Sequence, residues 1–208
     1  VMEKALPYER GQMPEEAQLL TCGIDVQLDH FYFAVRAWGA HLTSWLVDWG
    51  RVETWADIET VINRNYADVN GVIRNVNLAC IDSGYNTDEV YSFCARHMDV
   101  LVPTKGASVP LKSRYNVTIL DKRAAGFGLR LYTMDTNQMK NFIASRMSID
   151  AGAHGSWNVY RDIEREYADQ ICAEQRVEQR DKKGRVSVVW EKISSHAANH
   201  LLDCETNN

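Results

Sequence analysis

The sequence has no long apolar run and no paired cysteines, and both absences narrow its class. No window approaches the ~20 apolar residues of a membrane-spanning helix, and the N-terminus lacks the basic-then-apolar order of a signal peptide. We therefore expect an intracellular protein without membrane attachment. The five cysteines are scattered without the spacing of a zinc ribbon, which is typical of reduced core residues: Cys22, Cys80, Cys94, Cys172 and Cys204.

The sequence also lacks an excess of basic residues, since 23 lysines and arginines stand against 28 acids. The net charge of −5 is unusual for a nucleic-acid-binding protein, which commonly carries a basic surface. The segment from Pro103 to Arg130 departs from this average. It is basic and contains a single acid, Asp121. Its six basic residues are Lys105, Lys112, Arg114, Lys122, Arg123 and Arg130. The composition fits a phosphate-contacting strip and a solvated surface equally well.

The length and composition indicate one globular domain. With 208 residues, 45% of them hydrophobic, the chain can bury a sizeable core. Residues 1–18 are polar and without a clear period, so we expect a linker or N-terminal arm there, followed by a domain over residues 19–208. The chain begins at Val1 and stops at Asn208 inside an expected helix, so we expect it to be part of a longer polypeptide.

The order of elements predicts an α/β fold of the ribonuclease-H-like class. Three strands joined by short polar connections indicate an antiparallel meander, and helical crossovers then lead to parallel strands. The expected strands are 19–27, 30–39, 43–49, 76–82 and 100–103, with a helix from Trp55 to Tyr66 and one capped by Thr87 that ends near Met98. The prediction is thus a mixed sheet, an antiparallel meander plus parallel strands, flanked by helices.

The rest of the chain is predicted as additions to that sheet. Asp181-Lys182-Lys183-Gly184 lies between two alternating runs and is a clear signal for an added β-hairpin. We expect Ser195 to cap a last helix from His196 onward. Residues 107–126 are expected to be irregular, 128–134 a strand, 137–147 a helix, 151–158 a loop and 159–173 partly helical.

Three aspartates are candidates for a catalytic or metal-binding site. Asp25 and Asp82 each lie at the end of an apolar run of strand length, so parallel pairing would bring both to one edge of the sheet, where α/β folds bind ligands. Asp203 lies in the last helix. Carboxylates from three distant elements suit a divalent metal site. An aspartate in an apolar run is costly unless it is paired or metal-bound, which favours Asp25 most.

Structural roles compete with this interpretation. Asp82 precedes Ser83-Gly84, where an aspartate often only closes an Asx turn, and acids on helices are usually solvated. Asp29, Asp48 and Glu174 are reserve candidates, with Glu174 foremost among them.

Several basic residues suit contact with a phosphate. Lys105 follows a strand at the expected site edge, although a surface lysine would look the same. The tip of the hairpin carries Lys182, Lys183 and Arg185, which can reach a nucleic-acid backbone or remain solvated.

A zinc site is a weaker alternative. His196 and His200 are four residues apart in the expected helix, but a zinc protease would need glutamate at position 197, where alanine stands. We therefore interpret His200 as orienting Asp203 or contacting DNA.

Taken in order, the motifs resemble the nuclease domain of the large terminase subunit of lambda-like tailed phages, the GpA family. The resemblance covers nearly everything after Leu19. It is carried chiefly by Gly23-Ile24-Asp25-Val26-Gln27, Ile81-Asp82-Ser83-Gly84, Val102-Pro103-Thr104-Lys105-Gly106 and Asn199-His200-Leu201-Leu202-Asp203-Cys204.

This resemblance implies a metal-dependent endonuclease that cuts concatemeric DNA during packaging. It implies two divalent cations, Mg²⁺ or Mn²⁺, with Asp25 bridging both ions and Asp82 and Asp203 each completing one. The implied partners are double-stranded DNA and, through the full-length protein, the small terminase subunit and the portal, in the cytoplasm of an infected bacterium. The resemblance also implies an ATPase domain upstream. This chain itself has no phosphate-binding Gly-x-x-x-x-Gly-Lys loop, so we do not expect that ATPase within it.

Two other functions remain open. A transposase- or resolvase-like nuclease of the same fold would use similar acids. A non-catalytic ribonuclease-H-like module would bind a protein partner without metal.

Overall fold

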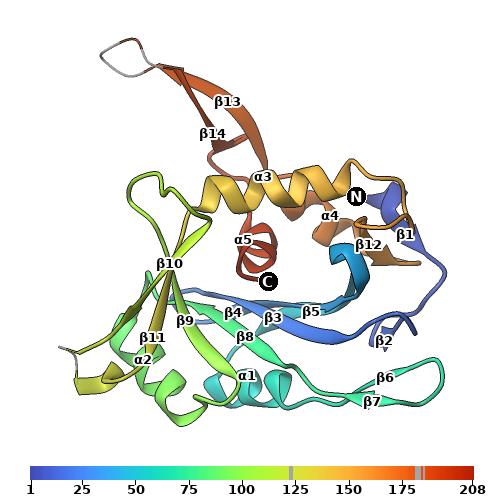
Figure 1. The fold of residues 1–208 in the computed structure, drawn as a ribbon, viewed down its shortest axis with the longest axis horizontal. Helices are drawn as coiled ribbons and strands as arrows, with labels where there is room; N and C mark the ends of the chain where they lie inside the picture. Colours follow the sequence, from blue (N-terminus) through green and yellow to red (C-terminus); the bar gives the residue numbers. More distant parts are fainter. Residues whose placement is uncertain (122–123, 181–183, 185) are drawn as a thin grey trace.

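The computed structural model describes residues 1–121, 124–180, 184 and 186–208 (Figure 1). Its strands are β1 (Ala5–Leu6), β2 (Gln12–Met13), β3 (Leu19–Val26), β4 (Phe31–Trp38), β5 (Ser44–Val52), β6 (Tyr66–Asp68), β7 (Ile73–Arg74), β8 (Leu78–Asp82), β9 (Leu101–Gly106), β10 (Tyr115–Ile119), β11 (Arg130–Met134), β12 (Trp157–Tyr160), β13 (Glu174–Arg180) and β14 (Val186–Lys192). Its helices are α1 (Trp55–Ile62), α2 (Thr87–Arg96), α3 (Thr136–Met147), α4 (Arg165–Ile171) and α5 (His200–Asn207), with 3-10 turns at Met2–Lys4, Ala40–Leu42 and Ala124–Gly126.

A nine-stranded mixed sheet forms the centre of the domain, in the order β1-β12-β5-β4-β3-β8-β9-β11-β10. Strands β3, β4 and β5 form the predicted antiparallel meander, and β8 and β9 follow β3 in parallel. Helices α3, α4 and α5 lie on one face of the sheet, and α1 and α2 lie on the other (Figure 1). Strands β13 and β14 form the predicted hairpin, which projects away from the sheet.

The N-terminal arm packs along the domain. Strand β1 pairs with β12 at one edge of the sheet, and Met13 is fully buried. The Tyr8 hydroxyl donates a hydrogen bond of 2.8 Å to the carbonyl of Leu46. None of the helices among the described residues has the length and apolar character needed to cross a bilayer.

Local signals explain α1 well. Thr54 and Asp57 form a capping box at its start, and Ile58, Val61 and Ile62 bury the predicted apolar face. The start of α2 differs from the prediction. Asn86, in a left-handed conformation, precedes the helix, and the Thr87 hydroxyl instead donates to the carbonyl of Ser83.

Some predicted irregular segments are strands. β10 lies within residues 107–126, β12 begins inside the predicted loop 151–158 and ends in the segment 159–173, and the short strands β6 and β7 follow α1. Every residue of β10 is exposed, although the sequence from Tyr115 to Ile119 alternates between apolar and polar side chains. Antiparallel pairing with β11 completes the strand, and five alternating residues alone do not reveal that partner.

The last helix begins later than predicted. α5 starts at His200, and residues 195–199 are not helical, because the chain turns where the amide of Ala197 bonds to the carbonyl of Ser194. Ser195 is therefore not its cap. His196 and His200 do not share a helical face, which removes the basis of the zinc alternative.

Helix α5 packs unusually close to β3. An added β-carbon on Gly23 would lie 1.9 Å from the carbonyl oxygen of Cys204, so only glycine permits this approach. The contact holds the helix that carries Asp203 directly over the strand that carries Asp25.

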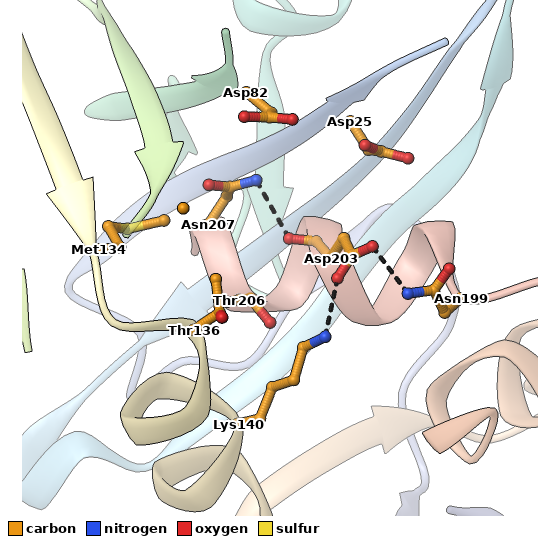
Figure 2. Close-up of a pocket in the computed structure, with 10 residues that line it drawn as sticks. Asp25, Asp82, Met134, Thr136, Lys140, Asn199, Asp203, Thr206 and Asn207 are labelled. Carbon is orange, nitrogen blue, oxygen red and sulfur yellow. Dashed lines mark hydrogen bonds and ion pairs between the residues drawn. The ribbon is translucent and has the colours of Figure 1, made fainter. Parts of the chain in front are cut away.

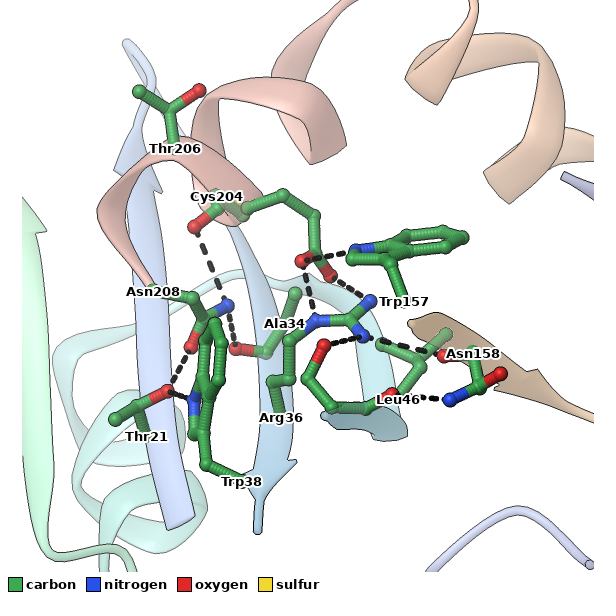
Figure 3. Close-up of polar contacts among 12 residues, drawn as sticks. Thr21, Ala34, Arg36, Trp38, Leu46, Trp157, Asn158, Cys204, Thr206 and Asn208 are labelled. Atoms are coloured by element: carbon green, nitrogen blue, oxygen red, sulfur yellow. Dashed lines mark hydrogen bonds and ion pairs between the residues drawn. The ribbon is translucent and has the colours of Figure 1, made fainter. Parts of the chain in front are cut away.

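A buried ion pair fixes α5 on the neighbouring strand, β4 (Figure 3). Arg36 is 0% exposed and Glu205 is 4% exposed, and the guanidinium donates to both carboxylate oxygens, at 2.6 and 3.0 Å. The Tyr167 hydroxyl also donates to Glu205, at 2.6 Å, and the indole of Trp157 lies beneath the guanidinium. These partners compensate two charges that would otherwise be very costly to bury.

Candidate active site

The register of the parallel strands brings two of the predicted acids together. Ile24 of β3 lies opposite Ile81 of β8, and each isoleucine immediately precedes one of the acids, Asp25 and Asp82. The two carboxylates therefore leave the sheet at the same edge. Strand β9 continues the pattern, since Asp82 lies opposite Thr104.

All three predicted acids line one cavity of about 300 Å³ between this sheet edge, α3 and α5 (Figure 2). Asp25 and Asp82 approach from the sheet side, and Asp203 approaches from α5. The lining residues are Asp25, Asp82, Gly106, Met134, Thr136, Lys140, Asn199, Asp203, Thr206 and Asn207.

Asp25 is 6% exposed and held by two neighbours. Its Oδ2 accepts a hydrogen bond of 2.7 Å from the side-chain amide of Gln27 and lies 2.9 Å from Nδ1 of His200. The His200 ring is stacked on Tyr32, with ring centres 4.7 Å apart. His200 thus contacts Asp25, whereas the sequence analysis paired it with Asp203.

Asp82 has both of the features considered from the sequence. Its Oδ1 accepts a hydrogen bond of 3.1 Å from the amide of Gly84, so the turn does form, and the carboxylate also faces the cavity. Burial raises the pKa of Asp82, and the negative charge of Asp25 raises it further. The ionised form of Asp82 is therefore not fully compensated by the protein.

Asp203 is held between a lysine and an amide. Its Oδ1 lies 3.0 Å from Nζ of Lys140, and its Oδ2 accepts a hydrogen bond of 2.9 Å from Asn199. Both donors also reach Glu174 Oε1, each at 2.7 Å. Burial raises the pKa of Asp203 although Lys140 opposes this, and Asp25 and Glu174 add to the rise.

The donor set fits a hard divalent cation. The cavity offers carboxylate oxygens together with the amide and hydroxyl oxygens of Asn199, Asn207 and Thr206, which suit Mg²⁺ or Mn²⁺ better than a softer metal. A cation would also relieve the charge that raises the pKa values of Asp82 and Asp203. In the part of the chain that the structure describes, no three His, Cys, Asp or Glu side chains already converge on one metal position.

Of the three reserve acids, only Glu174 lies beside the cavity. Glu174 adjoins the cavity through Lys140 and Asn199. Asp48 does not line it and instead pairs with Arg10 and Arg64, at 2.7 Å each. Asp29 is exposed and pairs with its neighbour His30.

The predicted basic residues fall into two groups. Lys105, near the end of β9, is exposed, and its charge slightly opposes the rise that burial causes in the pKa of Asp82. Lys182, Lys183 and Arg185 lie outside the described residues. The cysteines are all free, with Cys22, Cys94 and Cys204 buried as predicted and Cys172 exposed.

The sequence analysis missed Lys140. It is one of two buried residues of α3, together with Ile143 three positions later on the same face of the helix. That spacing was the signal that could have identified it.

Comparisons with known proteins identify the family of this chain. The family model described as "Terminase large subunit gpA, endonuclease domain" matches residues 1–208. The terminase large subunit of Escherichia phage lambda is 29% identical over 220 residues, and that of Enterobacteria phage P21 is 27% identical over 221 residues. Each match covers 98% of this chain and 33% of the relative, so the chain spans about a third of the length of these relatives.

A solved structure supports the fold independently. The large terminase nuclease from thermophilic phage G20c superposes with a TM-score of 0.55, at 14% sequence identity. The match covers 99% of this chain and 92% of that chain. The predicted ribonuclease-H-like fold class is therefore confirmed.

Proposed function

The chain belongs to the family of terminase large subunit gpA endonuclease domains, and from that premise we propose that it is a divalent-metal-dependent DNA endonuclease. The observation that carries the proposal is the single cavity lined by Asp25, Asp82 and Asp203. The proposed substrate is concatemeric phage double-stranded DNA, cut by hydrolysis of the phosphodiester bond.

In the proposed site, the three acids would hold two Mg²⁺ or Mn²⁺ ions, and Asp25 would be the ligand common to both. When bound, such ions activate the attacking water and stabilise the departing 3′ oxygen. The protein's own contribution is orientation. Gln27 and His200 fix the carboxylate of Asp25, and their contacts leave its second oxygen, Oδ1, available for a ligand.

We also propose which residues contact the DNA and which proteins the chain works with. Lys105 is exposed and directly precedes Gly106, which lines the cavity, so we propose that it contacts a phosphate of the bound strand. Lys182, Lys183, Arg185 and His200 are further proposed DNA contacts. In the whole protein, we propose an upstream ATPase domain and contacts with the small subunit and the portal, in the cytoplasm of the infected host.

The test is plasmid cleavage with Mg²⁺ or Mn²⁺. We expect the wild-type chain to cut and Asp25→Asn to lose at least ~100-fold in rate, since a metal ligand supplies several kcal/mol of transition-state stabilisation. Asp29→Asn is the matched control, because Asp29 is an exposed acid that does not line the cavity. Retained cutting by Asp25→Asn would refute the site, and absence of Mn²⁺ binding at millimolar metal would favour the non-catalytic module.

A further inference from the structure

Among the described residues that line the cavity, Lys140 is the one with a basic side chain. It is 7% exposed, and its ammonium lies 2.7 Å from Glu174 Oε1 and 3.0 Å from Asp203 Oδ1. Figure 2 shows it reaching from α3 toward Asp203, on the side of the cavity opposite Asp25 and Asp82. The ammonium therefore occupies a place between two carboxylates.

The environment keeps this ammonium charged. Burial alone would lower the pKa of Lys140, but the carboxylates of Asp203 and Glu174 outweigh it and raise the pKa. A buried lysine without such partners would tend to lose its proton. With two carboxylates at 2.7 and 3.0 Å, the ammonium of Lys140 places a positive charge in the wall of the cavity.

The ammonium of Lys140 has two opposing effects on a metal site that includes Asp203. Together with Asn199, it holds the two oxygens of the carboxylate from different sides, so the carboxylate has a fixed orientation toward the cavity. Its charge also repels any divalent ion that shares Asp203, because the two cations would be separated by little more than one carboxylate.

We propose that Lys140 is a positioning residue of the nuclease site, which fixes Asp203 in its working orientation and at the same time weakens divalent-cation binding on that side. This inference rests on the proposed function. It predicts that loss of the ammonium moves metal affinity and turnover in opposite directions. A lysine that only supported the fold would weaken both or neither.

The experiment compares wild type, Lys140→Met, Lys140→Gln and Lys140→Arg by calorimetric titration with Mn²⁺ and by plasmid cleavage at saturating Mn²⁺. In Lys140→Met, we expect Mn²⁺ to bind at least about threefold more tightly, because a neighbouring positive charge is gone. We expect its cleavage rate to fall about 10- to 100-fold, the usual cost of losing a partner that orients a metal ligand. Lys140→Arg, which keeps the charge, should retain wild-type affinity and recover part of the rate.

Lys192→Met is the matched control, since Lys192 is an exposed lysine that does not line the cavity, and it should change neither quantity. Lys140→Gln provides a second neutral side chain that can still donate to a carboxylate if the methionine variant does not fold. Weaker Mn²⁺ binding in a folded neutral variant, or an unchanged cleavage rate, would overturn the inference. If wild type does not cleave DNA at all, the proposed function fails, whereas the Mn²⁺ titration still tests the effect of Lys140 on affinity.

Discussion

The carbonyl oxygen of Cys204 lies against Gly23 so closely that a β-carbon on that residue would be 1.9 Å away from it. Gly23 precedes Asp25 by two residues, and Cys204 directly follows Asp203. This contact between two backbones therefore sets the separation of the two acids across the cavity.

Gly23→Ala should disturb both stability and the site. The new methyl group meets main-chain atoms that cannot rotate away, so α5 must shift, and we expect a loss of about 1–3 kcal/mol in the free energy of unfolding. Cleavage should fall too, because the shift moves Asp203. Urea denaturation and plasmid cleavage measure the two effects. Gly106→Ala is the stability control, since its added carbon would meet only Thr136, at 3.5 Å.

Glu205→Gln should be strongly destabilising. It leaves the guanidinium of Arg36 buried without its counter-charge, and breaking such a pair typically costs about 3–5 kcal/mol. The double variant Arg36→Met/Glu205→Gln should recover part of that loss, as chemical denaturation of both proteins would reveal. A loss in the double variant equal to the sum of the single losses would contradict this account. Arg165→Ala, which breaks an exposed pair with Asp169, should change stability little.

Asp82→Asn should stabilise the metal-free protein and at the same time abolish cleavage. Burial raises the pKa of Asp82, so its ionised form costs folding free energy at neutral pH, and a neutral amide avoids this cost. An asparagine can still accept the hydrogen bond from Gly84. We expect a higher melting temperature for the metal-free protein, together with loss of cleavage. A lower melting temperature would show that the charge of Asp82 is compensated in the folded protein.

Divalent-metal affinity should weaken as the pH falls. The pKa values of Asp82 and Asp203 are raised, so protons compete with metal for these carboxylates at higher pH than for exposed ones. The stability of the metal-free protein responds in the opposite sense. A folded-state pKa above the unfolded value means that these groups contribute less stability as the pH rises through that interval. Mn²⁺ titrations across the acidic range, with Asp82→Asn as the control with a shallower pH dependence, would test the first effect.

The parts of this fold that follow from local pattern were predictable. Strands β3 and β8 are apolar runs buried within the sheet, and that pattern alone placed Asp25 and Asp82 at one edge. Strand β10 was not predictable in this way, because it is fully exposed and depends on pairing with β11.

The polar contacts around the acids were beyond the reach of local pattern. Arg36 and Glu205 are 169 positions apart, and Lys140 meets Glu174 across 34 positions. Charged residues are normally solvated, so their residue type alone does not indicate burial. Only the folded arrangement reveals that each has a partner.

The spacing of Asp203 and Glu205 on α5 has a consequence for how this segment can vary. Residues two positions apart on a helix differ by roughly 200° in direction, so one carboxylate faces the cavity while the other enters the core beside Arg36. Inserting or deleting a single residue between them would turn one of the two by roughly 100° out of place. A change in the length of α5 at this point would therefore misplace either the carboxylate of the cavity or that of the buried ion pair.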